Sequence, residues 1–465
     1  MTAMQKLRIL EDIDEKYIME ARPRRLLKYG ETKTQRFDPE DNSVLMVLET
    51  VLSVASIALI VGAVFIWTLV GKDLLRVENS GDSESSVTSE QENDDKPISA
   101  YSEGLEFKLN EKNDGYKVVG IGTCKDTVIN IPPTYNGWPV TEIGVYAFKA
   151  HSNIVEVIIP NTVESIENEA FSNCSSLEKI IIPDSVCKIG SHVFADCYSL
   201  TEIKIPEGVT YINTLFVNCN VLKKVELPSS LEIIGECSFQ RCPELETVII
   251  PDGVKRIEVA AFESCRSLKE ITIPSSVLSI GQRVFEGCSL LERITLNEGL
   301  EKVSANAFAY CSRLENFVIP NSVKAIEDRA FHCCERLTDM TIPEGVTALG
   351  YDVFGSCTNL KSVVIKANIK EINGLFSGAY RVESVVLGEG IEVLGNDAVN
   401  RLENLKQVVL PRSIVHIRDY NFIDCGDAQI TYNGTVAEWE AITKEYGKLE
   451  KPITVQCIDG DLIIQ

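Results

Sequence analysis

A phenylalanine recurs along this chain at a nearly fixed interval, and this recurrence limits the possible folds more than any other feature. The interval is 23 residues, apart from two steps of 22, from Phe194 to Phe216 and from Phe354 to Phe376. A period of this length is typical of a solenoid in which every repeat forms one coil. The series runs through Phe148, Phe171, Phe194, Phe216, Phe239, Phe262, Phe285, Phe308, Phe331, Phe354, Phe376, Val399 and Phe422.

Each repeat carries the same apolar pattern after its phenylalanine. Leu follows at +6, Ile or Val at +9, Ile or Leu at +11, usually Pro at +12, Val at +15 and Ile at +18. The alternation at +9 and +11 predicts a strand with one buried face, which the proline ends. The second apolar pair predicts a brief strand or turn. Because one coil cannot bury its apolar side alone, the coils must stack. In one repeat these residues are Leu177, Ile180, Ile182, Pro183, Val186 and Ile189.

The repeat IIPDSVCKIGSHVFADCYSL and its relatives along the chain resemble the BspA-like class of leucine-rich repeats. The segments YNGWPVTEIGVYAF and ITYNGTVAEWEAI resemble the ends of such domains. The resemblance covers about 101–465 and implies a right-handed, β-rich leucine-rich-repeat solenoid of about 13 coils of 22–23 residues, capped at both ends. At about 4.8 Å per coil the body would be roughly 60 Å long. The resemblance also implies surface adhesion and contact with a host or an extracellular matrix.

Both ends of the repeat region carry signals for a cap, which an open solenoid needs because it would otherwise expose a strand edge and the core. Asp114-Gly115 lies between two alternating stretches and predicts a hairpin. Near the other end, Thr435 and Glu438 predict a capping box ahead of a short helix. Asp459-Gly460 then predicts a closing hairpin.

A long uncharged segment precedes the repeats. From Thr50 to Val70 there are 21 residues without a charge, and roughly 20 are needed to cross a bilayer. The absence of a small-residue cleavage site favours an uncleaved anchor over a signal peptide. Six basic residues lie between positions 22 and 36, which places the N-terminus in the cytoplasm and the repeats outside. The predicted segments are a cytoplasmic head at 1–43, a transmembrane helix at 44–71, a disordered acidic Ser-rich tether at 72–100, an N-terminal cap with a first irregular coil at 101–147, the solenoid at 148–428 and a C-terminal cap at 429–465.

The head and the tether have different compositions. The head has a helical apolar pattern and weakly resembles the short cytoplasmic heads of bacterial single-span regulators such as anti-sigma factors. It is either a solubilising segment without a partner or the binding site of a cytoplasmic partner. The tether has almost no apolar residues, so it cannot bury enough surface to become ordered. We expect it to hold the solenoid away from the membrane.

Most of the 15 cysteines follow the repeat. Stacked coils give equivalent residues parallel Cβ vectors, which do not suit disulfide geometry, whereas a free Cys packs as a small buried hydrophobe. We therefore expect a buried ladder of thiols, with zinc and regular disulfides as the alternatives. Cys124, Cys187, Cys237, Cys333 and Cys457 fall outside the pattern. The ten cysteines at +3 are Cys174, Cys197, Cys219, Cys242, Cys265, Cys288, Cys311, Cys334, Cys357 and Cys425.

Charge and motifs exclude several classes of function. A net charge of −23 argues against nucleic acid, since phosphate binding needs a basic face. The sequence contains no G-x-S-x-G elbow, P-loop, dinucleotide fingerprint or H-E-x-x-H motif, and metal spacing of the C-x-x-C kind is also absent. The four histidines fall at four different repeat phases. We therefore predict no catalytic, cofactor-binding or metal-binding residues, and a protein that is not an enzyme.

The +10 position lies between the two inward strand positions, so its side chain is predicted to face outward. In the later repeats this position forms an apolar-to-Thr stripe bordered by charged and polar residues. Exposed contiguous apolar patches tend to mark contacts, although β-propensity alone also favours such residues in any strand. The candidate ligand-binding residues are Val318, Thr341, Val364, Val386 and Val409.

Together these features predict a membrane-anchored cell-surface recognition or adhesion protein. Its extracellular solenoid would bind a protein or glycan ligand, and the chain would cross the membrane once. The alternative is a transmembrane sensor or regulator whose anti-sigma-like head signals when the solenoid binds its ligand outside.

Overall fold

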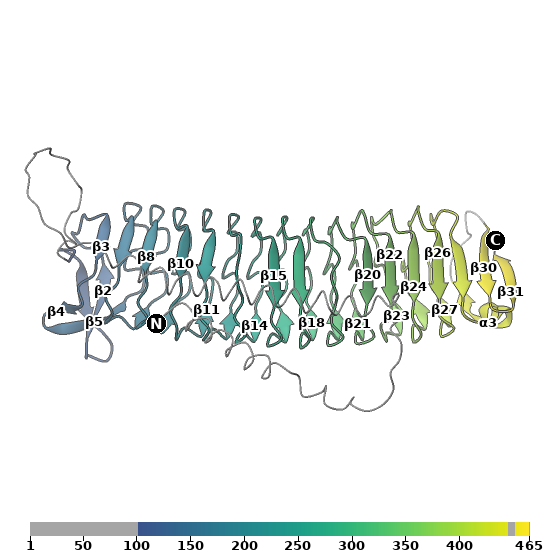
Figure 1. Cartoon of the computed structure of the whole chain (residues 1–465), viewed down its shortest axis with the longest axis horizontal. Coiled ribbons are helices and arrows are strands. Elements are labelled where there is room, and N and C mark those ends of the chain that lie inside the picture. Colours follow the sequence, from purple (N-terminus) through teal and green to yellow (C-terminus); the bar gives the residue numbers. More distant parts are fainter. Residues whose placement is uncertain (1–100, 445–451, 465) are drawn as a thin grey trace, which may run out of the picture. The chain divides into compact units, whose positions relative to one another are not determined.

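The computed structural model describes residues 101–444 and 452–464. All of them belong to the second of two compact units, Asp95–Gln465. The predicted head, transmembrane helix and tether lie outside the described residues. Among the residues that are described, no helix is long and apolar enough to cross a membrane. The described unit is an elongated solenoid of about 14 turns, which confirms the predicted fold class (Figure 1).

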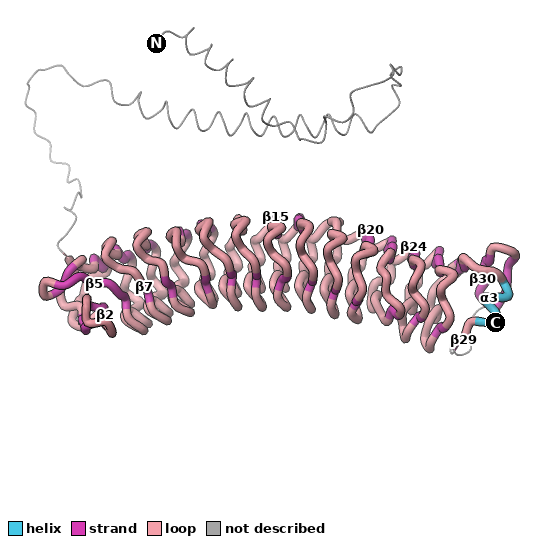
Figure 2. The backbone as a smooth tube through the Cα atoms, turned by 90° about the horizontal axis from the view of Figure 1, so that it is seen from below, coloured by secondary structure: helices cyan, strands magenta, loops and turns pink. Residues whose placement is uncertain are grey.

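Nearly every coil contributes one strand to each of two parallel ladders, and a turn segment carrying the repeated phenylalanine closes the coil (Figure 2). The first ladder uses the strands predicted at +8 to +11, whose buried residues alternate with outward-facing ones. Its members are β3 (Val128–Asn130), β6 (Glu156–Ile158), β8 (Lys179–Ile181), β10 (Glu202–Lys204), β12 (Lys224–Glu226), β15 (Glu270–Ile273), β17 (Arg293–Leu296), β20 (Asp339–Ile342), β22 (Ser362–Ile365), β24 (Ser384–Leu387), β26 (Gln407–Leu410) and β28 (Gln429–Tyr432).

The second ladder consists of two-residue strands at +17 and +18, where the second apolar pair predicts a brief strand or turn. Its members are β7 (Ser165–Ile166), β9 (Lys188–Ile189), β11 (Tyr211–Ile212), β13 (Ile233–Ile234), β14 (Arg256–Ile257), β16 (Ser279–Ile280), β18 (Lys302–Val303), β19 (Ala325–Ile326), β21 (Ala348–Leu349), β23 (Glu371–Ile372), β25 (Val393–Leu394), β27 (His416–Ile417) and β29 (Thr443–Lys444).

The phenylalanines form one continuous column inside the solenoid. From Phe148 to Phe376, successive rings are stacked with centroids 4.9–6.3 Å apart. All of these rings are buried. In each coil from Phe148 to Phe376 the ring is removed from water and contacts other rings, so the column contributes substantially to the apolar burial that holds these coils together.

The turn segment that carries each ring is also hydrogen-bonded to the next coil. In the first repeat, the backbone N–H groups of Tyr146, Phe148 and Ala150 donate to carbonyls of the following coil at 3.2, 2.8 and 2.8 Å. Tyr146 and Ala150 both have positive φ values, 62° in each case. This left-handed backbone recurs two residues before and two residues after most of the ring positions. It turns alternate N–H groups toward the neighbouring coil and satisfies them there.

The N-terminal cap is a hairpin followed by a first coil. β1 (Glu106–Leu109) and β2 (Tyr116–Gly120) pair antiparallel on either side of the predicted turn. β5 (Trp138–Ile143) pairs with β2, β7 and the short strand β4 (Thr134–Tyr135), while β3 pairs with β6. The irregular coil at 101–147 therefore joins both ladders, which is why the solenoid has about 14 turns instead of about 13.

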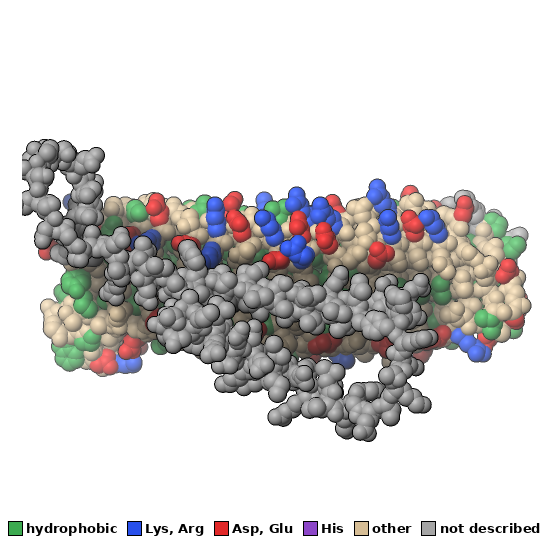
Figure 3. All heavy atoms as spheres, in the orientation of Figure 1, with side chains coloured by type: hydrophobic (Ala, Val, Ile, Leu, Met, Phe, Trp, Pro, Cys, Tyr) green, Lys and Arg blue, Asp and Glu red, His purple; other side chains and the backbone are tan. Residues whose placement is uncertain are grey.

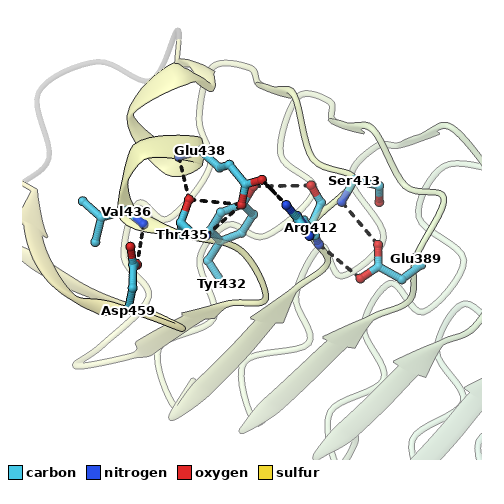
Figure 4. Close-up of polar contacts among 8 residues, drawn as sticks. All are labelled: Glu389, Arg412, Ser413, Tyr432, Thr435, Val436, Glu438 and Asp459. Carbon is cyan, nitrogen blue, oxygen red and sulfur yellow. Dashed lines mark hydrogen bonds and ion pairs between the residues drawn. The ribbon is translucent and has the colours of Figure 1, made fainter.

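The C-terminal cap covers the last coil with a short helix and a hairpin (Figure 4). The predicted capping box is present at α3 (Val436–Ala441), where Thr435 and Glu438 each accept from the other's backbone N–H. The Glu438 carboxylate also accepts from Arg412 Nε at 3.0 Å, which ties the helix to the preceding coil.

The closing hairpin of this cap pairs β30 (Ile453–Cys457) with β31 (Gly460–Ile464). Its two-residue turn is Ile458-Asp459, one residue earlier than the sequence predicts. Asp459 lies in this turn, and its Oδ1 accepts from the backbone N–H of Val436 at 2.8 Å. That bond joins the closing hairpin to the start of the helix.

Candidate recognition surface

The predicted stripe lies on the outer face of the longer-strand ladder. Thr341, Val364, Val386 and Val409 are direct register partners on β20, β22, β24 and β26. Thr431 on β28 pairs with Val409 and extends the row by one coil, which the sequence analysis missed. Thr341 is exposed, and the other members of this row are half-buried.

The outward residues at +8, beside this row, are mostly charged in the early coils and uncharged in the later ones. In earlier coils they are largely charged and form ion pairs between neighbouring strands, such as Lys179 with Glu156 at 2.7 Å. Figure 3 shows acidic and basic side chains alternating along the upper edge of the central coils. From β22 onward the equivalent residues carry no charge. We call the uncharged surface the neutral face, consisting of Thr341, Val364, Val386, Val409 and Thr431 with Ser362, Ser384, Gln407 and Gln429.

Val318, the remaining predicted residue, lies just before the neutral face but in no strand. Its side chain is 82% exposed. The ladder is interrupted here, since β17 and β20 are not paired through this coil. The +9 residue is Phe317 in place of the usual Ile or Val, and its half-buried ring leans on Phe331 at 5.2 Å. An aromatic residue at +9 is visible in the sequence, but it does not account for the gap by itself, since the coil with Val248 at +9 also lacks this strand and leaves Ile249 84% exposed.

A side chain bridges to the next coil at this gap in the ladder. Asn316 Oδ1 accepts from the backbone N–H groups of Thr338 and Asp339, at 2.8 and 3.2 Å. Next to it opens a hollow of about 660 Å³, lined among others by Phe317, Val318 and Thr341. The neutral face therefore ends, at its N-terminal side, in a hollow that has apolar residues on its wall and also the charged residues Glu298, Asp339, Glu344 and Lys366.

The ten cysteines at +3 form the expected ladder of buried thiols. Each Sγ donates to the backbone carbonyl of the ring position in the preceding coil, for example Cys265 to Phe239 O at 3.1 Å. This hydrogen bond was not predicted, because it depends on the stagger between coils. Burial raises the pKa of Cys174 to about 12 and that of Cys425 to about 11. These thiols therefore stay protonated and unreactive near neutral pH.

Replacing Cys265 with serine is expected to lower the free energy of unfolding by about 1–2 kcal/mol. The shorter C–O bond leaves the hydroxyl farther from Phe239 O, so a buried donor is poorly satisfied. Denaturant unfolding measures the change. Cys187→Ser at an exposed position is the control, expected to stay within about 0.5 kcal/mol. If a mild reductant sharply lowered the melting temperature of the unmodified protein, the assignment of free thiols would be wrong.

Comparison with known protein families agrees with this architecture. The chain matches the family described as BspA type Leucine rich repeat region (6 copies), in overlapping segments at 141–269, 213–334, 255–379 and 301–431. These segments span more than half of the chain, so the protein belongs to the BspA type leucine-rich-repeat family. Solenoids of this kind are typically binding scaffolds without an enzymatic site.

Several solved structures are similar to the chain. A leucine rich cell surface protein from Faecalibacterium prausnitzii A2-165 is 30% identical over 76% of this chain and 100% of that chain, with a TM-score of 0.48. A leucine rich repeat protein from T. pallidum is 31% identical over 41% of this chain and 90% of that chain, with a TM-score of 0.39. A leucine-rich repeat protein from Bacteroides ovatus ATCC 8483 is 25% identical over 76% and 100%, with a TM-score of 0.37. A search of curated protein sequences finds no match.

Proposed function

We propose that this protein is a membrane-anchored cell-surface receptor or adhesin whose solenoid binds an extracellular protein through the neutral face. Two features outside the neutral face support a location at the cell surface. The segment at 44–71 contains 21 uncharged residues from Thr50 to Val70, enough to span a bilayer, and the BspA type repeats resemble domains associated with surface adhesion. The lack of any recognisable catalytic motif in the sequence agrees with a role in binding.

The observation that carries the proposal is the composition of the neutral face. Its central row consists of valines and threonines in direct register. A border of charged residues runs beside it, including Lys406 paired with Glu383 at 2.6 Å. An apolar centre within a polar rim is the usual anatomy of a protein–protein interface. The hollow beside Val318 supplies a pocket for an anchoring side chain of the partner.

The shape of this face favours a protein over a small molecule as the ligand. The five strands that carry the row are about 4.8 Å apart, so the row is roughly 19 Å long. Its exposed side chains are short, and a face of this kind offers little depth outside the hollow. Small ligands instead need an enclosing cavity that buries most of their surface.

Transfer of the compact unit to another cell tests this function. Residues 95–465 include the core and both caps, and we would display them on an unrelated anchor in a non-adherent bacterium. Adherence to at least one protein of a panel of host-surface and matrix proteins is the expected result. If only the complete chain in its own membrane gave a response to such a protein, the sensor alternative with a signalling head would replace this proposal.

The orientation in the membrane can be tested separately. Protease added to intact cells is expected to remove the solenoid and to leave the head at 1–43 protected, because basic residues before a span favour the cytoplasm. Immunoblotting with tags at the two ends measures both fragments. A digested head with an intact solenoid would contradict this orientation, and an ectodomain that begins near residue 70 would indicate a cleaved signal.

A further inference from the structure

A second hollow lies on a different side of the coils, among the turn segments that carry the phenylalanine column. Its volume is about 300 Å³. Three tyrosines line it, Tyr351, Tyr380 and Tyr420, and they are 48%, 51% and 57% exposed. Asp397 and Arg401 contribute charged groups to the same wall. None of these residues belongs to the neutral face.

A shortened coil accounts for the hollow. Between the short strand and the ring position, the coil that ends at Phe376 has one residue fewer than the coil that ends at Phe354. Gly374 occupies this stretch, and a Cβ atom there would lie only 2.6 Å from Cε2 of Tyr351. The tyrosine ring therefore lies directly over the glycine backbone. The rings of Phe354 and Phe376 are 6.3 Å apart, the widest spacing in the column.

The other 22-residue step shows that a missing residue need not leave a hollow. Before Phe216 the shortened stretch carries Asn213 and Thr214. Asn213 Nδ2 donates to Ser191 Oγ at 3.2 Å, and Thr214 Oγ1 lies 3.0 Å from Nδ1 of His192. Polar side chains thus bridge to the preceding coil there. Before Phe376 the equivalent residues are Asn373 and Gly374, so the side chain that Thr214 supplies is missing there, and the hollow lies at this glycine.

The backbone bonds between the coils at the hollow are incomplete, although Gly374 N–H donates to Asn396 O at 3.0 Å. Phe354 and Ser356 donate their backbone N–H groups to the next coil at 3.0 and 2.6 Å. Within the described part of the chain, the equivalent N–H groups of Phe376 and Gly378 make no backbone hydrogen bond to the following coil. Of these two residues Gly378 lines the hollow, so its N–H is a polar backbone group that a ligand can satisfy.

Asn400 and Asp397 form a hydrogen-bonded pair on one wall of the hollow. Asn400 Nδ2 donates to Asp397 Oδ1 at 2.6 Å, which orients the carboxylate. Asn400 Oδ1 is buried and has no hydrogen-bond partner in the described structure. A buried acceptor without a donor costs free energy. Because Asn400 Oδ1 has no contact with solvent, the group of this pair that a hydroxyl entering the hollow can reach is the carboxylate of Asp397, which lines it.

From these features we infer that the hollow is a carbohydrate-binding site that acts independently of the neutral face. The C–H faces of a sugar ring are apolar and stack on tyrosine rings, while its edges carry hydroxyl groups that need donors and acceptors. Tyr380 and Tyr420 supply the rings, and Asp397, Asn400 and Arg401 supply the polar groups. A volume of about 300 Å³ is at the lower end of small-ligand sites. The site therefore takes one or two sugar residues at the end of a glycan.

The test uses the full-length chain, purified in a detergent without a sugar headgroup and applied to a glycan array. Binding to at least one glycan is expected, and Tyr380→Ala with Tyr420→Ala should lower the affinity about tenfold or more. Tyr146→Ala with Tyr198→Ala is the matched control, because these tyrosines are exposed on the same kind of turn in early coils. It should stay within about twofold.

The double variant must be folded for its loss of binding to be meaningful, so its fold is measured and a further variant is available. Circular dichroism and melting curves show whether the double variant is folded, and if it is not, Arg401→Gln replaces it, with an expected loss of about threefold or more. Absence of glycan binding by the full-length chain, or equal binding by the folded variants, would overturn the site. Capture of a protein that depends on these tyrosines would overturn it too. Because the two surfaces are separate, Lys substitutions in the neutral face should leave glycan binding unchanged.

Discussion

Replacing Phe262 with alanine is expected to lower the free energy of unfolding by about 3–5 kcal/mol. The ring is fully buried and stacked between Phe239, at 4.9 Å, and Phe285, at 5.3 Å. Alanine removes both ring contacts and leaves a cavity, and the hydrogen bonds between turns limit how far the coils can collapse into it. Denaturant unfolding of residues 95–465, followed by circular dichroism, measures the loss.

Two variants serve as controls for this substitution. Phe262→Leu retains most of the apolar volume and is expected to cost less than about 1.5 kcal/mol. Val259→Ala lies in the same coil, but its side chain is 39% exposed, so a change within about 0.5 kcal/mol is expected. A loss below about 1 kcal/mol for Phe262→Ala would contradict the central role that we assign to the ring column.

Placing lysine at Val364, Val386 and Val409 together is expected to weaken binding of the protein partner about a hundredfold or more. The three side chains are register partners on adjacent strands, so the substitution puts three positive charges in one row of an apolar surface. A partner must then bury these charges without compensation. The solenoid itself should remain folded, because long lysine side chains can extend their amines into water. Binding and circular dichroism are both measured.

The matched control places three lysines at the same repeat position elsewhere, as Ile181→Lys, Thr272→Lys and Thr295→Lys. All three side chains face outward on the same ladder, and the neighbouring residues there are already charged. This variant carries the same added charge and should retain the partner's affinity within about threefold. Full binding by the folded neutral-face variant would show that the partner binds elsewhere.

Much of this architecture could be predicted from the sequence because its interactions repeat with the coil. The 23-residue period alone places Phe171 on Phe194 and Cys174 beside Cys197, since equivalent residues of stacked coils must be neighbours. The alternation of buried and exposed residues in β15 and β20 also follows directly from the pattern. The capping box at Thr435 and Glu438 was predictable for another reason, as it depends on residues within one turn of a helix.

The sequence could not determine which contacts form at a coil that departs from the repeat. The two shortened coils share an asparagine, Asn213 and Asn373, and differ at the next position, yet the sequence does not show that Thr214 is bridged to His192 while Gly374 lines a hollow. Likewise, the substitution at Phe317 is visible in the sequence, but its outcome depends on the rings of Phe308 and Phe331 against which it packs.

The difference has a physical cause. A regular coil meets neighbours like itself, so its own residues determine its contacts, and the period, the buried ring column and the thiol ladder can be predicted from the sequence alone. An irregular coil leaves an empty space or an unpaired polar group. Only the side chains of adjacent coils can fill that space or pair with that group. Whether they fill it depends on distances of a few tenths of an ångström between residues more than twenty positions apart. Only the tertiary structure therefore located the hollow beside Val318 and the hollow beside Gly374.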